Sequence, residues 1–170
     1  MNSLTKKLLS WGVGGVIAVS AGYVVAPFEG MTNQAYKDIV GVATVCFGST
    51  NGVKMGDYRT TEQCEKGLAK ELTDYNKNMR KHVTVNLLPY EEVAYTSFVW
   101  NLGETNFKNS TLLKKLNTDD RAGACAELLR WNKAGGRVVK GLDNRRKFEY
   151  EVCMGKNTEV NKALEAVKQP

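Results

Sequence analysis

An uncharged segment near the start of the chain constrains its folding more than any other feature. The segment extends from Leu8 to Ala26 and directly follows Lys6 and Lys7. As one α-helix it is barely long enough to cross a bilayer, because a span needs about 20 residues. Positive charge before a span favours a cytoplasmic N-terminus, with the rest of the chain outside. The sequence therefore predicts an N-terminal apolar helix within residues 1–27, used for export, and a separate folded part over residues 28–170.

The segment is only weakly apolar, since glycine, alanine and serine interrupt its valines and leucines. Small residues recur every four positions, at Ser10, Gly14, Ala18, Gly22 and Ala26. Such a face lets a helix approach another helix closely, in a membrane or against the body of a protein. Three fates are open: a signal peptide cleaved near Val19-Ser20-Ala21, a permanent anchor, or a segment that later leaves the membrane intact. The scarcity of leucine favours the third.

The chain has four cysteines, Cys46, Cys64, Cys125 and Cys153. An even number in an exported chain predicts disulfide bonds rather than free thiols. Among the three possible pairings, we expect Cys46–Cys64 and Cys125–Cys153, because each closes a modest loop within one half of the chain. No two cysteines have the spacing of a metal knuckle, and His82 is the only histidine. No metal or organic cofactor is therefore expected.

The composition favours one globular domain after the segment, with 42% hydrophobic and 25% charged residues. The formal net charge of +6 favours anionic partners, such as a membrane surface, nucleic acid or a cell-wall polymer. The lysines and arginines are scattered, and no helix carries a basic stripe with base-stacking aromatics. Nucleic acid is therefore not an expected partner.

Turn residues and hydrophobic periodicity predict an α+β architecture. β-Branched residues and glycines over 35–46 predict a β-hairpin. Capping and periodic residues predict one helix from Thr60 towards His82 and another from Pro89 to Gly103. Shorter helices are expected over 110–117, 118–131 and 144–154, and a fraying tail after Gly155, with at most a short helix over 160–167. The expected molecule is a small hairpin lobe and a larger helical lobe, with a cleft between them.

Two carboxylic acids and a hydroxyl follow the apolar segment closely. They are Glu29, expected at a helix end, and Asp38 and Thr44, expected on the hairpin. In glycoside hydrolysis one carboxylic acid protonates the leaving oxygen, and a second carboxylate positions or activates water. Taken singly, each residue could be an ordinary surface, turn or strand residue. Their joint spacing after an export segment favours the catalytic interpretation.

The spacing Glu-x8-Asp-x5-Thr, with Tyr36 and two glycines around it, resembles the catalytic stretch of the phage-type lysozymes, glycoside hydrolase family 24. Further similar stretches are Ser97–Gly103, Phe107–Leu113, Trp131–Gly136 and Gly141–Arg146. The resemblance covers residues 28 to about 153 and implies a lysozyme-like fold. It also implies an endolysin, a muramidase that hydrolyses the β-1,4 bond between N-acetylmuramic acid and N-acetylglucosamine in peptidoglycan and lyses the host cell.

The resemblance assigns a role to each of the three residues. Glu29 is the general acid, expected to stay protonated because Phe28 and the small lobe shield it. Asp38 stays ionised and, with Thr44, positions the water. Whether the reaction inverts or retains the anomeric configuration depends on the distance between the Glu29 and Asp38 carboxyls, which the sequence does not give.

Other residues of the resembling stretches have weaker assignments. Tyr36 and Arg145 are expected to contact substrate, Tyr36 by packing or stacking in the cleft and Arg145 through anionic or amide groups of the peptide stem. At least one of Arg145 and Arg146 is expected on a solvated helix face. Trp100 and Trp131 are expected in the core.

The chain departs from the family pattern just after Thr44. The family pattern is Thr-x-Gly-x-Gly-His, whereas this chain has Cys46 in place of a glycine and Ser49 in place of the histidine. Cys46 fits a disulfide with Cys64 that would brace the hairpin. The change at Ser49 leaves open how the floor of the cleft is hydrogen-bonded.

The apolar segment resembles that of the signal-arrest-release (SAR) endolysins. This implies export by the host Sec translocon, a first state in the inner membrane with the catalytic domain periplasmic, and later release into the periplasm as a monomer. No cysteine lies in residues 1–27, so we expect control by topology alone. Two rival functions remain: a catalytically inactive, cationic, membrane-tethered wall-binding protein, and a lytic transglycosylase that needs only Glu29.

Overall fold

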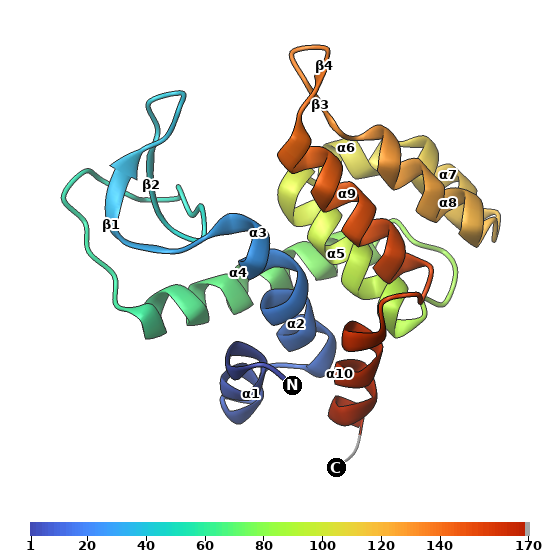
Figure 1. Ribbon diagram of the computed structural model, residues 1–170, viewed down its shortest axis with the longest axis horizontal. Coiled ribbons are helices and arrows are strands. Elements are labelled where there is room, and N and C mark those ends of the chain that lie inside the picture. The colour runs from blue at the N-terminus through green and yellow to red at the C-terminus, as the bar shows by residue number, and fades with distance from the viewer. Residues whose placement is uncertain (169–170) are drawn as a thin grey trace.

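The computed structural model describes residues 1–168, which form two lobes connected by a long helix, α4 (Thr61–Arg80) (Figure 1). The small lobe at one end of α4 holds an antiparallel pair of strands, β1 (Thr32–Lys37) and β2 (Ala43–Cys46). The larger lobe is helical. The expected α+β architecture, with a hairpin lobe and a helical lobe, is confirmed.

The helical lobe is built around α5 (Pro89–Leu102), which packs against α9 (Lys140–Cys153) and α4. Its shorter elements are α6 (Glu104–Lys108), α7 (Thr111–Asn117), α8 (Arg121–Glu127), the 3₁₀ helix η2 (Leu128–Arg130), and the small hairpin of β3 (Lys133–Ala134) and β4 (Arg137–Val138). Val93, Phe98 and Leu128 are fully buried in its core. The expected disulfide Cys125–Cys153 joins α8 to the end of α9.

Local sequence signals explain where the two long helices begin and end. The Thr60 side chain accepts a hydrogen bond from the Gln63 N–H at 3.1 Å, and the Gln63 side chain accepts one from the Thr60 N–H at 2.8 Å. This reciprocal cap starts α4. Pro89 occupies the first turn of α5, and Gly103, with a φ of 86°, ends it. Both predicted helices are confirmed.

In this folded structure the N-terminal segment is not one continuous helix, so the predicted apolar helix is not confirmed here. It forms α1 (Ser3–Ser10), α2 (Gly15–Val19), a π-helix η1 (Ser20–Val25) and α3 (Ala26–Glu29). The chain turns between α1 and α2, where Gly12 has a φ of 80°, a conformation that glycine adopts without steric penalty. Within residues 1–168, no single helix is both long and apolar enough to cross a bilayer.

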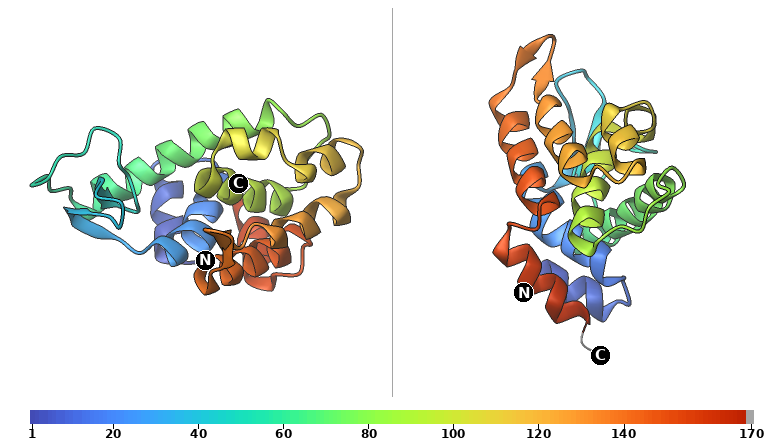
Figure 2. Two further views of the ribbon diagram at one scale, coloured as in Figure 1. Left: turned by 90° about the horizontal axis from the view of Figure 1, so that it is seen from above. Right: turned by 90° about the vertical axis from the view of Figure 1, so that its right-hand side faces the viewer.

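The segment packs into the body of the protein (Figure 2). Ala18, Ala21 and Val25 are fully buried and form a core with Leu68 and Leu72 of α4. This core is separate from that of the helical lobe. The first 25 residues are therefore an integral part of the folded structure.

The expected face of small residues is split by the turn between α1 and α2. Ala18 and Gly22 are buried, whereas Ser10 and Gly14 are exposed. A Cβ atom on Gly22 would lie 2.2 Å from Oγ1 of Thr5, so a glycine is needed where α1 crosses η1. The predicted close approach occurs at the second half of the face only.

The C-terminal helix α10 (Thr158–Lys168) packs beside α2, so the two ends of the chain lie together (Figure 1). Val160, Ala163 and Leu164 are buried, and a Cβ atom on Gly15 would lie 2.7 Å from Cγ2 of Val167. The expected fraying tail is therefore wrong, and the short helix is confirmed and longer. Its apolar residues pack against α2, which is near the opposite end of the sequence.

Candidate active site

Glu29 lies where the N-terminal helices meet the small lobe. It is the last residue of α3, and Gly30, with a φ of 67°, ends the helix. The side chain of Glu29 is 20% exposed. It borders a cleft of about 420 Å³ that is also lined by residues of the loop after β2, of α4 and of α5. The cleft expected between the lobes is present, and Glu29 is at its edge.

Arg145, on α9, holds Glu29 in place. Its Nη1 pairs with Oε1 of Glu29, although the two residues are 116 positions apart in sequence. Arg145 also donates hydrogen bonds to Oε1 of Glu149 at 3.1 Å and to Oγ of Ser97 at 3.2 Å. The position of Glu29 therefore depends on α5 and α9, which carry these partners.

Glu149 is the centre of a buried charge network behind this pair. It is 0% exposed and accepts hydrogen bonds from Ser97 at 2.6 Å and from both Arg145 and Arg146. Arg146 also donates to the carbonyl oxygen of Trp131 at 3.1 Å. Burial lowers the pKa of Arg146, and the negative charge of Glu149 opposes that shift. A buried charge that loses its partner destabilises a fold strongly, so these groups depend on one another.

Arg145 and Arg146 are both buried, whereas at least one of them was expected on a solvated helix face. Arg145 is 3% exposed and Arg146 is 0% exposed, so the prediction of a solvated helix face is wrong for both. Arg145 lies behind Glu29, where it orients a carboxylate of the protein itself. Arg145 and Arg146 lie four and three residues before Glu149, a spacing that places the three side chains on the same face of one helix. This spacing was the sequence signal that could have predicted their ion pairs.

Asp38 lies in the turn between β1 and β2. Its Oδ1 accepts hydrogen bonds from the backbone N–H groups of Val40 at 3.0 Å and Val42 at 2.8 Å. Within residues 1–168, its Oδ2 accepts no hydrogen bond. The carboxylate therefore stabilises its own turn with one oxygen and leaves the other available.

Thr44 is opposite Tyr36 in the β1–β2 ladder. Thr44 is 3% exposed, and its hydroxyl donates a hydrogen bond to the carbonyl oxygen of Val42 at 3.0 Å. Tyr36 is 43% exposed, so its ring is accessible. In the described part of the chain, the residues lining the 420 Å³ cleft include Glu29 but neither Asp38 nor Thr44. The hairpin thus pairs Thr44 with Tyr36 and carries Asp38 in its turn, and among the described residues none of the three lines the cleft.

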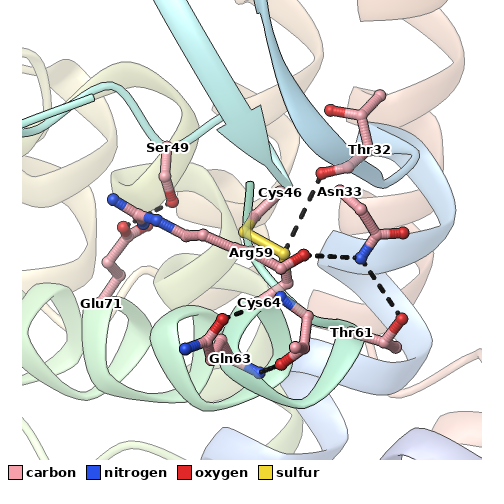
Figure 3. The surroundings of a disulfide bond; sticks show 10 residues. Thr32, Asn33, Cys46, Ser49, Arg59, Thr61, Gln63, Cys64 and Glu71 are labelled. Carbon is pink, nitrogen blue, oxygen red and sulfur yellow. Dashed lines mark hydrogen bonds between the residues drawn. A yellow bond between two sulfur atoms is a disulfide. The ribbon is translucent and has the colours of Figure 1, made fainter. Parts of the chain in front are cut away.

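The floor of the cleft contains residues that sequence reasoning left open or assigned elsewhere. Ser49 donates a hydrogen bond to Oε1 of Glu71 at 2.7 Å (Figure 3). A serine thus ties the loop after β2 to α4 where the family pattern has a histidine. Trp100 is partly buried, and it packs against the core that the N-terminal segment forms with α4 while also lining the cleft. A Cβ atom on Gly48 would lie 3.7 Å from Oε2 of Glu29, so Gly48 leaves that oxygen accessible.

The expected disulfide Cys46–Cys64 joins the end of β2 to the first turn of α4 (Figure 3). Cys46 has a φ of 62°, in the left-handed region that favours glycine. The family pattern has a glycine at this position, so the backbone shape is the one that the pattern would provide. In this chain a covalent bond to α4 supports that conformation with a side chain present.

Metal-ligating side chains are not grouped in this structure. Among the described residues there is no cluster of three or more histidine, cysteine, aspartate or glutamate side chains placed to hold a metal ion. All four cysteines are in disulfides. The polar side chains that line the cleft carry carboxyl, hydroxyl and amide groups.

The chain is similar to known phage proteins over most of its length. The phage lysozyme family model matches residues 26–149. A SAR-endolysin of bacteriophage PS119 is 39% identical over 147 residues, which cover 83% of this chain and 88% of that relative. The family match begins near Glu29 and ends at Glu149, so it includes both ends of the network that holds Glu29.

Two solved structures of the P1 phage endolysin Lyz have a similar fold to different degrees. The active form has a TM-score of 0.78 at 19% identity, covering 92% of this chain and 94% of that one. The secreted inactive form has a TM-score of 0.52 at 18% identity, covering 93% and 98%. At these identities the likeness concerns the fold alone. The arrangement of the present chain is closer to that of the active form.

Proposed function

The chain belongs to the phage lysozyme family, as a muramidase-type glycoside hydrolase with the function of a phage endolysin, and we propose that it hydrolyses the β-1,4 bond between N-acetylmuramic acid and N-acetylglucosamine in peptidoglycan. Hydrolysis of this bond would lyse the host cell. Glu29 would be the general acid, and Asp38 and Thr44 would position the attacking water.

The observation that carries the proposal is the way Glu29 is held. One carboxyl oxygen pairs with buried Arg145, and the other faces the cleft beside Gly48. A proton on the second oxygen would point at a glycosidic oxygen bound in the cleft. Arg145 also donates to Glu149, so protonation of Glu29 would not leave the buried arginine without an anionic partner.

The hydrogen bonds on the hairpin support the role of the other two residues. The hydroxyl hydrogen of Thr44 is already donated to Val42, so its oxygen can only accept from a water molecule. The free Oδ2 of Asp38 can also only accept while it is ionised. A water bound by both would direct its two hydrogens towards the protein. Its lone pair would then be presented to the anomeric carbon of the substrate.

The test is digestion of purified peptidoglycan by the wild type and by Glu29→Gln. The amide keeps the shape of the side chain and cannot donate an acidic proton, so we expect the rate to fall by about 10²- to 10⁴-fold. The products of the wild type should carry a free reducing muramic end. Glu165→Gln, an exposed glutamate on α10, is the matched control and should digest at the wild-type rate.

Other products would support the rival functions. Products that end in a 1,6-anhydro sugar would identify a lytic transglycosylase. Absence of digestion by the wild type, together with retained binding to the wall, would identify an inactive wall-binding protein. Equal digestion by wild type and Glu29→Gln would contradict the assignment of the acid.

We also propose that residues 1–27 are the export and SAR segment and residues 28–170 the catalytic domain. The segment would first lie in the inner membrane with the N-terminus cytoplasmic, after export by the Sec translocon, and would then leave intact for the periplasm. The relatives named SAR-endolysins support this order. So does the folded position of the segment, because its apolar residues have a buried site to enter once they leave the bilayer.

Two positions allow a clean test of release. Ser10 and Gly14 are exposed, and a Cβ atom on Gly14 would meet no atom within 4 Å. Leucine at both positions adds about 0.3–0.6 kcal/mol of insertion energy each without disturbing the folded protein. We expect Ser10→Leu/Gly14→Leu to remain in the membrane fraction after a wash in about 1 M salt, which removes proteins held by charge alone. It should not lyse cells, while the detergent-extracted protein digests peptidoglycan normally.

The alanine pair Ser10→Ala/Gly14→Ala is the control and should be released and lytic. If the leucine variant lysed cells while held in the membrane, control by topology would be contradicted. If the protein recovered from the periplasm began just after Ala21, the segment would be a cleaved signal peptide.

A further inference from the structure

A second hollow lies along α4, next to the cleft. It has a volume of about 580 Å³ and runs between the loop Trp11–Gly14 and α4. Thr73 lines this hollow and Tyr75 lines the cleft. Asp74 lines both hollows, so they lie on adjacent sides of the helix. We call this second hollow the Trp11 groove.

The Trp11 groove is basic and contains an aromatic ring. Its α4 wall carries Lys66, Lys70 and Lys77 against a single acidic residue, Asp74. Nζ of Lys66 lies 5.0 Å from the centre of the Trp11 ring. The nearby ion pairs, Lys66 with Glu62 at 2.6 Å and Lys70 with Asp74 at 3.0 Å, are exposed to solvent. Exposed pairs of this kind are weak, so these lysines can exchange their partners for another anion.

We infer that the Trp11 groove binds the anionic headgroups of a phospholipid bilayer after the protein has folded. Tryptophan and lysine are the side chains that favour the level of the headgroups in a membrane interface. Each lysine near an anionic surface contributes about 1 kcal/mol. The groove exists only in the folded protein, because the loop that forms one wall belongs to the N-terminal segment. This contact is distinct from insertion of that segment.

The position of the groove gives such binding a consequence for orientation. In Figure 1, α4 runs between the β1–β2 lobe and α1. A bilayer contacting the groove would lie on the α1 side, and the cleft would open on the adjacent side of α4. The released protein would stay on the surface of the membrane, with Glu29 on a neighbouring side that the bilayer leaves uncovered.

The test is sedimentation with vesicles, using the full-length folded protein and the variant Lys66→Gln/Lys77→Gln. With vesicles containing phosphatidylglycerol, we expect the variant to partition about thirtyfold less than the wild type. Binding of the wild type should disappear in phosphatidylcholine vesicles and in about 1 M salt, where charges are screened within about 3 Å. Lys108→Gln/Lys114→Gln removes two exposed lysines elsewhere in the helical lobe and should bind like the wild type.

Several outcomes would overturn the inference. Equal loss in both lysine pairs would show attraction by net charge alone. Binding that resists high salt would show insertion of the N-terminal segment. Unchanged vesicle binding with slower digestion of intact peptidoglycan would assign the groove to the wall instead. Digestion of soluble peptidoglycan fragments, measured in parallel, should be equal in all variants, so failure of this inference is separate from failure of the proposed function.

Discussion

The two carboxylates at the site, Glu29 and Asp38, are held in opposite ways. Glu29 is paired with Arg145, which lies 116 residues away and is itself bound to the fully buried Glu149. Asp38 accepts hydrogen bonds from Val40 and Val42 in its own turn. One carboxylate is positioned by the packing of the helical lobe, and the other by a local hairpin.

Because of this difference, substitutions around Glu29 and at Asp38 should affect the free energy of unfolding and the catalytic rate differently. A change that disturbs the Glu29 network leaves buried charges unpaired, so it should lower the free energy of unfolding as well as activity. A change at Asp38 that preserves the turn should lower activity alone. The hairpin also depends on its connections to α4, the Cys46–Cys64 disulfide and the Ser49–Glu71 hydrogen bond. Substitutions can remove the Arg145 ion pair, the disulfide and the Ser49–Glu71 hydrogen bond one at a time.

The largest effect is expected from Arg145→Met. The change leaves Glu29 without its cation and removes one of the two cations around Glu149, so the free energy of unfolding should fall by about 3–5 kcal/mol. Urea unfolding of the oxidised protein measures this. Arg145→Lys keeps the charge without the planar fork and should recover part of the loss. A loss below about 1 kcal/mol for Arg145→Met would mean that the acid is not held by the core.

The next effect concerns the disulfide at the base of the hairpin. Cys46→Ser/Cys64→Ser opens a loop with a sequence separation of 18, and the free energy of unfolding should fall by about 3 kcal/mol. In Cys46→Gly/Cys64→Ala, glycine removes the strain of a side chain at positive φ, about 1 kcal/mol. The loss should then be about 2 kcal/mol. Equal losses in urea unfolding would show that the backbone at Cys46 carries no strain.

Asp38→Asn should separate rate from stability. The amide oxygen of asparagine can still accept from Val40 and Val42, so the free energy of unfolding should change by no more than about 0.5 kcal/mol. The loss of charge should lower kcat by about 10²-fold or more, equivalent to about 2.7 kcal/mol. Steady-state kinetics on soluble peptidoglycan fragments measures the rate. Wild-type kcat in this variant would remove Asp38 from the mechanism.

The smallest effect is expected from Ser49→Ala. It removes the hydroxyl that donates to Glu71, and the net value of such a hydrogen bond is about 1 kcal/mol. Ser49→Thr keeps the donor and is the control. If urea unfolding showed the same loss for both variants, the loop after β2 would be held to α4 by the disulfide alone.

The parts of the fold that could be predicted are those with local signals. The Thr60–Gln63 cap, Pro89 and Gly103 mark the ends of α4 and α5 by their own chemistry. The disulfide pairing followed from loop length. Glu29, Asp38 and Thr44 were found through their spacing and the family resemblance, and the structure adds what holds each of them.

The parts that sequence reasoning missed depend on partners far away in the chain. The burial of Arg145 and Arg146 requires Glu29, Ser97 and Asn101, on other helices. The turn after Trp11 lets α1 fold back across η1, which an uncharged segment considered alone does not indicate. Helix α10 is polar enough to suggest a fraying tail, but its apolar side packs against α2, near the other end of the chain.

The N-terminal segment has two alternative apolar environments. On the proposed topology these are the bilayer and the interior of the protein, and the segment partitions between them. Val19, Val24 and Val25 are fully buried in the body, and such burial is worth about 1.5–3 kcal/mol per side chain relative to water. The bilayer offers about 0.3–0.6 kcal/mol per strongly apolar residue. Lysis would then be timed by the difference between two transfer energies, and substitutions that change only one of them would advance or delay it.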